Sequence, residues 1–63
     1  MSPSKREIAM SARATIELFG DGAIGKTKER LAEVEAEGEE AAIAFWRELL
    51  AEVTRLHKQR HKF

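Results

Sequence analysis

Hydrophobic and polar residues alternate with the period of an α-helix in three stretches of this chain. The first begins at Ser4-Lys5-Arg6-Glu7, where the Ser-x-x-Glu spacing is typical of a capping box. At about 100° per residue, one side of this helix carries Ile8, Ala12, Thr15, Ile16, Leu18 and Phe19, and the other carries Arg6, Arg13 and Glu17. Gly20-Asp21-Gly22 interrupts the pattern. The sequence therefore predicts a first helix over about residues 4–19.

The second stretch begins after Asp21, which is a good N-cap residue for a helix. Its apolar positions Ile24, Thr27, Leu31 and Val34 follow a spacing of three and four residues along one narrow stripe. Gly38 ends the pattern, and the periodicity resumes at once. We therefore predict a second helix over about residues 22–37 and a short connection to a third, so that the two form an antiparallel hairpin.

The third stretch is the most clearly helical. Its apolar side is predicted to carry Ala42, Phe45, Trp46, Leu49, Val53 and Leu56, with Ile43 and Leu50 flanking it. This arc is broad enough to pack on two neighbours at once. We therefore predict an all-α fold in which residues 1–63 form one domain. It is expected to be a three-helix bundle whose third helix spans about residues 39–58, followed by a basic tail at residues 57–63.

The chain's length limits the core that it can build. It has 63 residues and no cysteine, so disulfides cannot stabilise it. Chains of this size often gain stability by oligomerising, and a homodimer through the third helix and part of the first is expected. The candidate interface residues are Phe45, Trp46, Leu49, Leu50 and Val53. Within this group, Trp46 is expected in the core, and Phe45 is the better candidate for contact with a partner.

Composition also gives an expectation for location. The chain has no apolar run long enough to cross a membrane and no apolar core of a signal peptide. A cytoplasmic protein that does not bind membranes is the expectation. The chain has 11 basic residues (Lys and Arg) and 11 acidic residues (Asp and Glu), so its overall charge does not favour nucleic acid or membrane as a partner.

Charge is nevertheless distributed unevenly along the chain. Residues 29–52 hold eight glutamates against two arginines, including the run Glu33, Glu35, Glu37, Glu39 and Glu40. This run is predicted to be solvated, although such a surface also suits the basic groove of a partner. The last eleven residues hold no acid and four cations, Arg55, Lys58, Arg60 and Lys62. Cations complement the C-terminal dipole of a helix, and contact with nucleic-acid phosphate or an acidic protein surface is the alternative.

The segment Gly20–Thr27 matches G-x-x-x-x-G-K-[ST] and resembles the phosphate-binding loop of Rho-type small GTPases. The resemblance implies that Gly20 and Gly25 shape the loop, that Lys26 reaches the phosphates and that Thr27 binds magnesium. Such a loop needs a buried strand before it and a helix after it. Residues 14–19 instead continue a helical pattern, so we interpret the match as accidental and keep phosphate binding as an alternative.

Other chemistry has little basis in this sequence. His57 and His61 stand four residues apart, which places two imidazoles on one helical face, but two ligands do not make a metal site. The chain has no cysteine and no serine that sequence can place beside a histidine and an acid. We therefore predict no catalytic residues, no cofactor and no metal.

A family resemblance supports the helical prediction. Gly20-Asp21-x-Ala23, Gly38-Glu39-x-Ala41, Trp46 and Leu56 together resemble a set of short uncharacterised helical proteins of alphaproteobacteria. The likeness spans roughly residues 15–56 and implies a bacterial helical protein, but it implies no activity.

The function expected from these observations is binding rather than chemistry. We predict a small non-enzymatic protein-interaction module that regulates or inhibits a larger assembly. The first alternative is a nucleic-acid-binding helical domain that uses the basic C-terminal tract. The second is nucleotide or phosphate binding at Gly20–Thr27.

Overall fold

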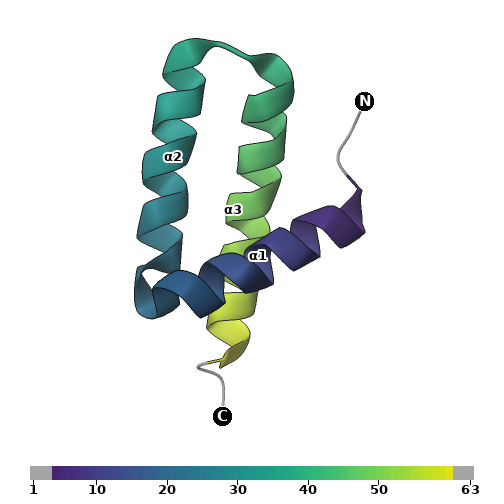
Figure 1. The fold of residues 1–63 in the computed structure, drawn as a ribbon, viewed down its shortest axis with the longest axis vertical. Helices are drawn as coiled ribbons and strands as arrows, with labels where there is room; N and C mark the ends of the chain where they lie inside the picture. Colours follow the sequence, from purple (N-terminus) through teal and green to yellow (C-terminus); the bar gives the residue numbers. More distant parts are fainter. Residues whose placement is uncertain (1–3, 61–63) are drawn as a thin grey trace.

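The structure is a computed structural model that describes residues 4–60 of the chain. These residues form the helices α1 (Lys5–Phe19), α2 (Ala23–Glu37) and α3 (Glu40–Arg60), with a 3₁₀ turn, η1 (Gly20–Gly22), between the first two (Figure 1). No strand occurs in the part of the chain that the structure describes. The prediction of an all-helical fold is therefore confirmed over this range.

Local chemistry determines where α1 begins. Ser4 has an extended backbone, and its side chain accepts a hydrogen bond from the backbone N–H of Glu7 at 3.1 Å. This bond satisfies one of the four N–H groups that the first turn leaves without a helical partner. The predicted N-cap is confirmed.

Two glycines end the first two helices. Gly38 follows α2 with φ of 81° in the left-handed region, and its N–H donates to the carbonyl of Val34. Gly20 follows α1 with φ of 55° and donates to the carbonyl of Ile16. Residues with a Cβ atom rarely adopt a positive φ, so glycine at these positions lets the chain leave the helix without strain.

The start of α2 differs from the prediction. Its N-cap residue is Gly22 rather than Asp21, and no side chain caps it. The cause is η1, in which the N–H of Ala23 already donates to the carbonyl of Gly20. The chain thus enters α2 from a helical turn and does not form the extended N-cap that an aspartate usually occupies.

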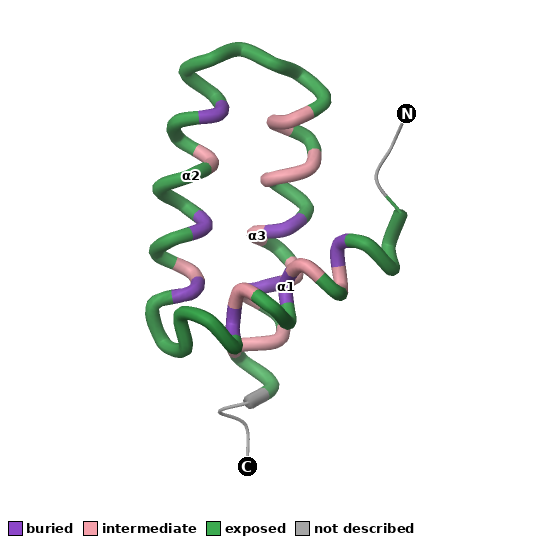
Figure 2. The backbone as a smooth tube through the Cα atoms, in the orientation of Figure 1, coloured by how far each residue is buried: buried purple, intermediate pink, exposed green. Residues whose placement is uncertain are grey.

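The second and third helices form an antiparallel hairpin. They lie side by side, joined only by Gly38 and Glu39 (Figure 1). α1 crosses in front of α3 in this view and contacts α3 more extensively than it contacts α2. The buried and half-buried positions of α2 and α3 lie on the sides that face each other (Figure 2).

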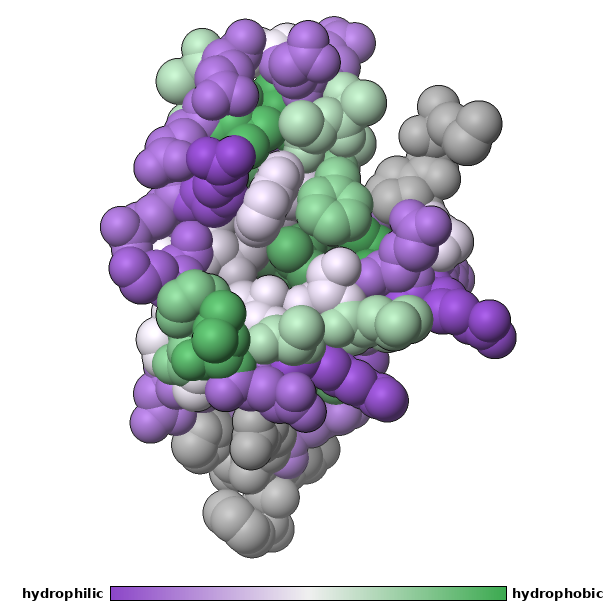
Figure 3. Space-filling view, in the orientation of Figure 1, coloured by the Kyte–Doolittle hydropathy of each residue, from purple (hydrophilic) through white to green (hydrophobic). Residues whose placement is uncertain are grey.

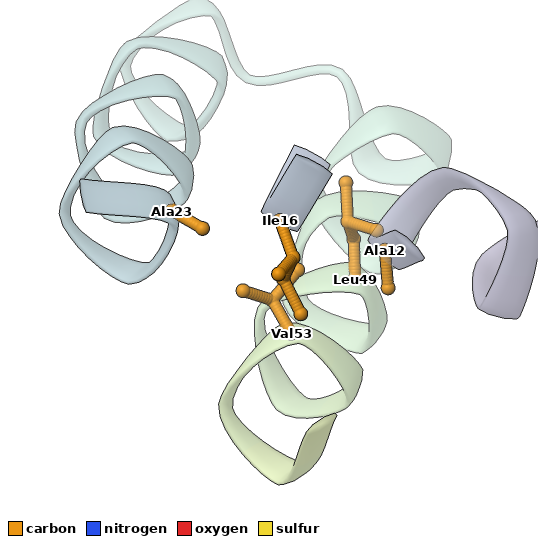
Figure 4. Close-up of a cluster of buried hydrophobic side chains, with 5 residues drawn as sticks. All are labelled: Ala12, Ile16, Ala23, Leu49 and Val53. Atoms are coloured by element: carbon orange, nitrogen blue, oxygen red, sulfur yellow. The ribbon is translucent and has the colours of Figure 1, made fainter. Parts of the chain in front are cut away.

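The centre of the core lies where α1 crosses α3. Ala12 and Ile16 of α1 meet Leu49 and Val53 of α3, and Ala23 at the start of α2 joins them (Figure 4). Small alanines at this crossing allow the helix backbones to approach closely, and Val53 is completely buried. Ile24, Phe45, Trp46 and Leu56 pack against this cluster and are partly buried.

The outer side of α1 departs from the prediction. Leu18 was expected on the apolar side of this helix with Ile8 and Ile16, but it is 76% exposed. Ile8, Ala12 and Ile16 are each four residues apart and are all buried, whereas Leu18 is two residues from Ile16. Two residues rotate the side-chain direction by about 200°, so Leu18 points away from α3.

Within residues 4–60, no helix is long and apolar enough to cross a membrane.

Candidate interaction surface

The five predicted interface residues separate into two groups. Leu49 is 2% exposed and Val53 is fully buried, because α1 covers both. These two side chains therefore stabilise the fold of the single chain and have no free surface for a partner. Phe45, Trp46 and Leu50 are half-buried and retain exposed atoms.

The two aromatic residues of α3 contact each other. Their ring centroids are 5.7 Å apart, and the planes are inclined by 86°, which is the edge-to-face arrangement that aromatic pairs favour. The guanidinium of Arg30, on α2, lies 5.9 Å from the centroid of the Trp46 ring. This cation–π contact connects the two helices of the hairpin.

Beside Trp46 the surface forms an open hollow of about 320 Å³ between the three helices. We call it the aromatic hollow. Its lining residues come from all three helices: Thr15, Phe19, Lys26, Thr27, Glu29, Arg30, Glu33 and Trp46. Phe19 and Trp46 provide the apolar surface, and charged side chains of α2 surround it.

The charges around the aromatic hollow are of both signs. Arg30 forms an ion pair with Glu33 at 2.7 Å, and both side chains are more than half exposed. Lys26 and Glu29 are also exposed. Exposed pairs of this kind contribute little to stability, so these side chains are free to rearrange around a bound group at low cost.

The acidic run continues along α2 to the connection with α3. Glu33, Glu35, Glu37, Glu39 and Glu40 are all exposed. Glu35 contacts Arg47 of α3 at 3.1 Å, which is an ion pair across the hairpin. The placement agrees with the predicted solvated surface.

In the described part of the basic tract, Arg55 is paired with a neighbouring acid. Both side-chain oxygens of Glu52 accept hydrogen bonds from Arg55, at 2.8 and 2.6 Å. These bonds lower the pKa of Glu52 and raise the pKa of Arg55, and the positive charge of Arg13 on α1 lowers the pKa of Glu52 further. Lys58 is exposed, and Arg60 ends α3. The side chain of Arg60 and the whole of Lys62 lie outside the described residues.

The segment that matches a phosphate-binding loop is helical. Residues 14–19 belong to α1, and Gly25, Lys26 and Thr27 lie inside the first turns of α2. The Thr27 hydroxyl donates to the carbonyl of Ala23 at 2.8 Å, and the residue is only 2% exposed. Gly20 forms part of η1. These residues therefore lack the strand, the loop and the accessible hydroxyl that phosphate and magnesium binding require.

The structure describes one of the two histidines. His57 is half-buried on α3, and His61 lies outside the described residues. Among residues 4–60, no three His, Cys, Asp or Glu side chains are grouped as metal ligands.

Sequence reasoning missed the exposed apolar side chains of α1. Met10 is 64% exposed and Phe19 is 42% exposed, in addition to Leu18. Met10 and Leu18 each stand two residues from a buried position of the same helix. That spacing is visible in the sequence, but the apolar side predicted for the first helix was too broad and included Leu18.

Comparisons with known proteins give no relative from which to transfer a function. No protein-family model, curated protein or solved structure matches the chain.

Proposed function

We propose that this chain is a small non-enzymatic protein-interaction module whose aromatic hollow receives an apolar side chain of a partner protein. The observation that carries the proposal is the arrangement at Trp46, where an indole ring makes a cation–π contact with Arg30 and lies beside the part-exposed Phe19. Tryptophan and arginine are among the residues most enriched at the energetic centres of protein interfaces.

The surroundings of the hollow support a protein partner. The charged rim of Lys26, Glu29 and Glu33 around an apolar centre has the composition of an interface core with its polar rim. The hollow is open, and its volume lies at the low end for pockets that enclose small molecules. One protruding side chain matches it better than an enclosed ligand does.

A photo-crosslinking experiment tests this function. Lys26, on the rim, is replaced by p-benzoylphenylalanine, and the full chain is irradiated in an extract of the cells that produce it. We expect a discrete adduct with a second protein, identified by mass spectrometry. The same photoreactive residue at Glu37, at the far end of α2, is the matched control and should give no such adduct.

A second variant links the adduct to the hollow. Phe19→Ser removes apolar surface from the rim and should reduce the yield of the Lys26 adduct at least several-fold. Because Phe19 is part-exposed, circular dichroism should show unchanged helicity in this variant. Equal adducts at positions 26 and 37, or an adduct that is insensitive to Phe19→Ser, would contradict the proposal.

A further inference from the structure

α1 has two apolar stripes on opposite sides. The buried stripe consists of Ile8, Ala12 and Ile16, which pack toward α3. The second stripe consists of Met10, Ala14 and Leu18, and we call it the α1 ridge. Its members are four residues apart, so they line one face of the helix, about 200° from the buried stripe.

The α1 ridge is uncovered in the single chain. Met10 is 64% exposed, Leu18 is 76% exposed, and Ala14 is exposed as well. α1 lies in front of the hairpin in Figure 1, with no other described helix over its outer side. The space-filling view shows hydrophobic atoms along this helix, most strongly at the end that joins α2 (Figure 3). A continuous apolar face of this kind is typical of an interaction surface.

We propose that the α1 ridge binds a second copy of this chain, with the two α1 helices antiparallel and Ala14 at the two-fold axis. A symmetric dimer needs a self-complementary surface. In this register Met10 of each copy lies opposite Leu18 of the other, so a long side chain meets a long one at both ends. Ala14, the smallest member of the ridge, lies at the centre, where it allows close approach of the helices.

The charges beside the α1 ridge favour a second copy of this chain as its binding partner. Arg13 and Glu17 are exposed on the same flank of the ridge, and neither forms an ion pair within residues 4–60. In a two-fold antiparallel pair, identical flanks face each other. Arg13 of one copy then lies about 3 Å along the helix axis from Glu17 of the other and about 3 Å from Arg13 of the other. The charges along the flank follow the order Glu, Arg, Arg, Glu, so two attractive neighbours outweigh one repulsive pair. The symmetry produces this ion pair twice.

The size of the contact sets the expected affinity. α1 has 15 residues and is therefore about 22 Å long. A contact through one such helix is smaller than the interfaces of stable dimers. We therefore expect a dissociation constant of about 1 to 100 µM.

Sedimentation equilibrium of the full chain tests the dimer. Between about 0.2 and 500 µM, a range that brackets this constant, the mass should rise from 7.1 kDa toward twice that value. Leu18→Glu should remain monomeric throughout. Its circular dichroism melt at the lowest concentration should match that of the native chain, because Leu18 is exposed. Lys28→Glu, on the exposed side of α2, is the matched control and should dimerise normally.

A charge exchange tests whether the flanks that carry Arg13 and Glu17 face each other in the dimer. Arg13→Glu places two acids on the flank, and Glu17→Arg places two bases there, so each variant alone should weaken self-association about tenfold or more. Mixed in equal amounts, the two variants form complementary flanks and should associate at least as well as the native chain. An arrangement that keeps the two flanks apart gives no such recovery.

The outcomes separate this inference from the proposed function. A native chain that stays monomeric at 500 µM, or a mixture of charge variants that stays monomeric, overturns the antiparallel dimer. Neither result affects the aromatic hollow, which is tested by the adduct at position 26. A dimer that forms without any partner adduct supports the inference and contradicts the proposed function.

Discussion

At the scale of single residues, Thr27 shows how one side chain can match a motif and serve a structural purpose. It lies on the inner side of α2 and is almost fully buried, and its hydroxyl is bonded to the carbonyl of Ala23. Thr15 and Thr54 make the same bond to the carbonyls of Ser11 and Leu50. The bond satisfies a polar group inside a helix, so the threonine methyl can pack in the core like that of a valine.

Substitutions at Thr27 distinguish packing from chemistry. Thr27→Val keeps the buried shape and removes only the hydroxyl, so the free energy of unfolding should change by less than about 1 kcal/mol. Thr27→Ser keeps the hydroxyl and loses the buried methyl, and we expect a loss of about 1 kcal/mol. Urea denaturation followed by circular dichroism measures both. If the valine variant is the less stable of the two, the hydroxyl has a role beyond satisfying its own hydrogen bond.

At the scale of helices, a glycine inside α2 and the glycine that follows it have opposite effects. Gly38 ends α2 with a positive φ, whereas Gly25 lies within the helix and has no positive φ. A Cβ atom at either position would meet no neighbouring atom within 4 Å. The difference between the two positions is therefore a matter of backbone conformation alone.

Alanine substitutions should separate these two roles. Gly38→Ala forces a residue with a side chain into the left-handed region, and we expect a loss of about 1 to 2 kcal/mol in the free energy of unfolding. Gly25→Ala restricts the unfolded chain and favours the helix, and we expect a gain of about 0.5 to 1 kcal/mol. The midpoints of urea denaturation measure both the expected loss of stability in Gly38→Ala and the expected gain in Gly25→Ala. Equal effects at the two positions would show that the turn at Gly38 has a different conformation.

At the scale of the whole molecule, Glu52 lies between charges from two helices. Arg55 on α3 bonds to it directly, and Arg13 on α1 acts on it through space, so its pKa lies below its ordinary value near 4.5. A carboxyl group with a lowered pKa in the folded state stabilises the fold above its ordinary pKa. That contribution is lost as the pH falls through the lowered pKa.

Acid titration of the native chain and Glu52→Gln measures this contribution. The native melting temperature should fall more steeply than that of the variant as the pH falls below about 4.5. The expected difference is small because Arg55 is more than half exposed. Parallel curves for the two proteins would show that the Arg55 contact does not stabilise the fold.

The helical spacing of the hydrophobic residues was sufficient to predict the helices from the sequence. The Ser4 cap, the break at Gly38 and the stripe with Thr27 and Val34 follow from local rules that act within a few residues. The direction in which α1 crosses the hairpin depends on contacts between distant residues. For that reason the sequence did not show that Leu49 and Val53 are covered within the chain.

The candidate site was predicted less completely. Phe45 and Trp46 were named from the sequence, and both keep exposed surface. Phe19 and Arg30 were not connected with them, because the aromatic hollow forms only when all three helices meet. No local pattern brings a residue at the end of α1 beside one in the middle of α3.

The two-residue connection between α2 and α3 also bears on how quickly the molecule folds. A hairpin joined at Gly38 and Glu39 brings its helices together with very little loss of loop entropy. Chains dominated by such short-range contacts fold within microseconds to milliseconds. We expect the hairpin to assemble first and to present Leu49 and Val53 as the surface onto which α1 then closes.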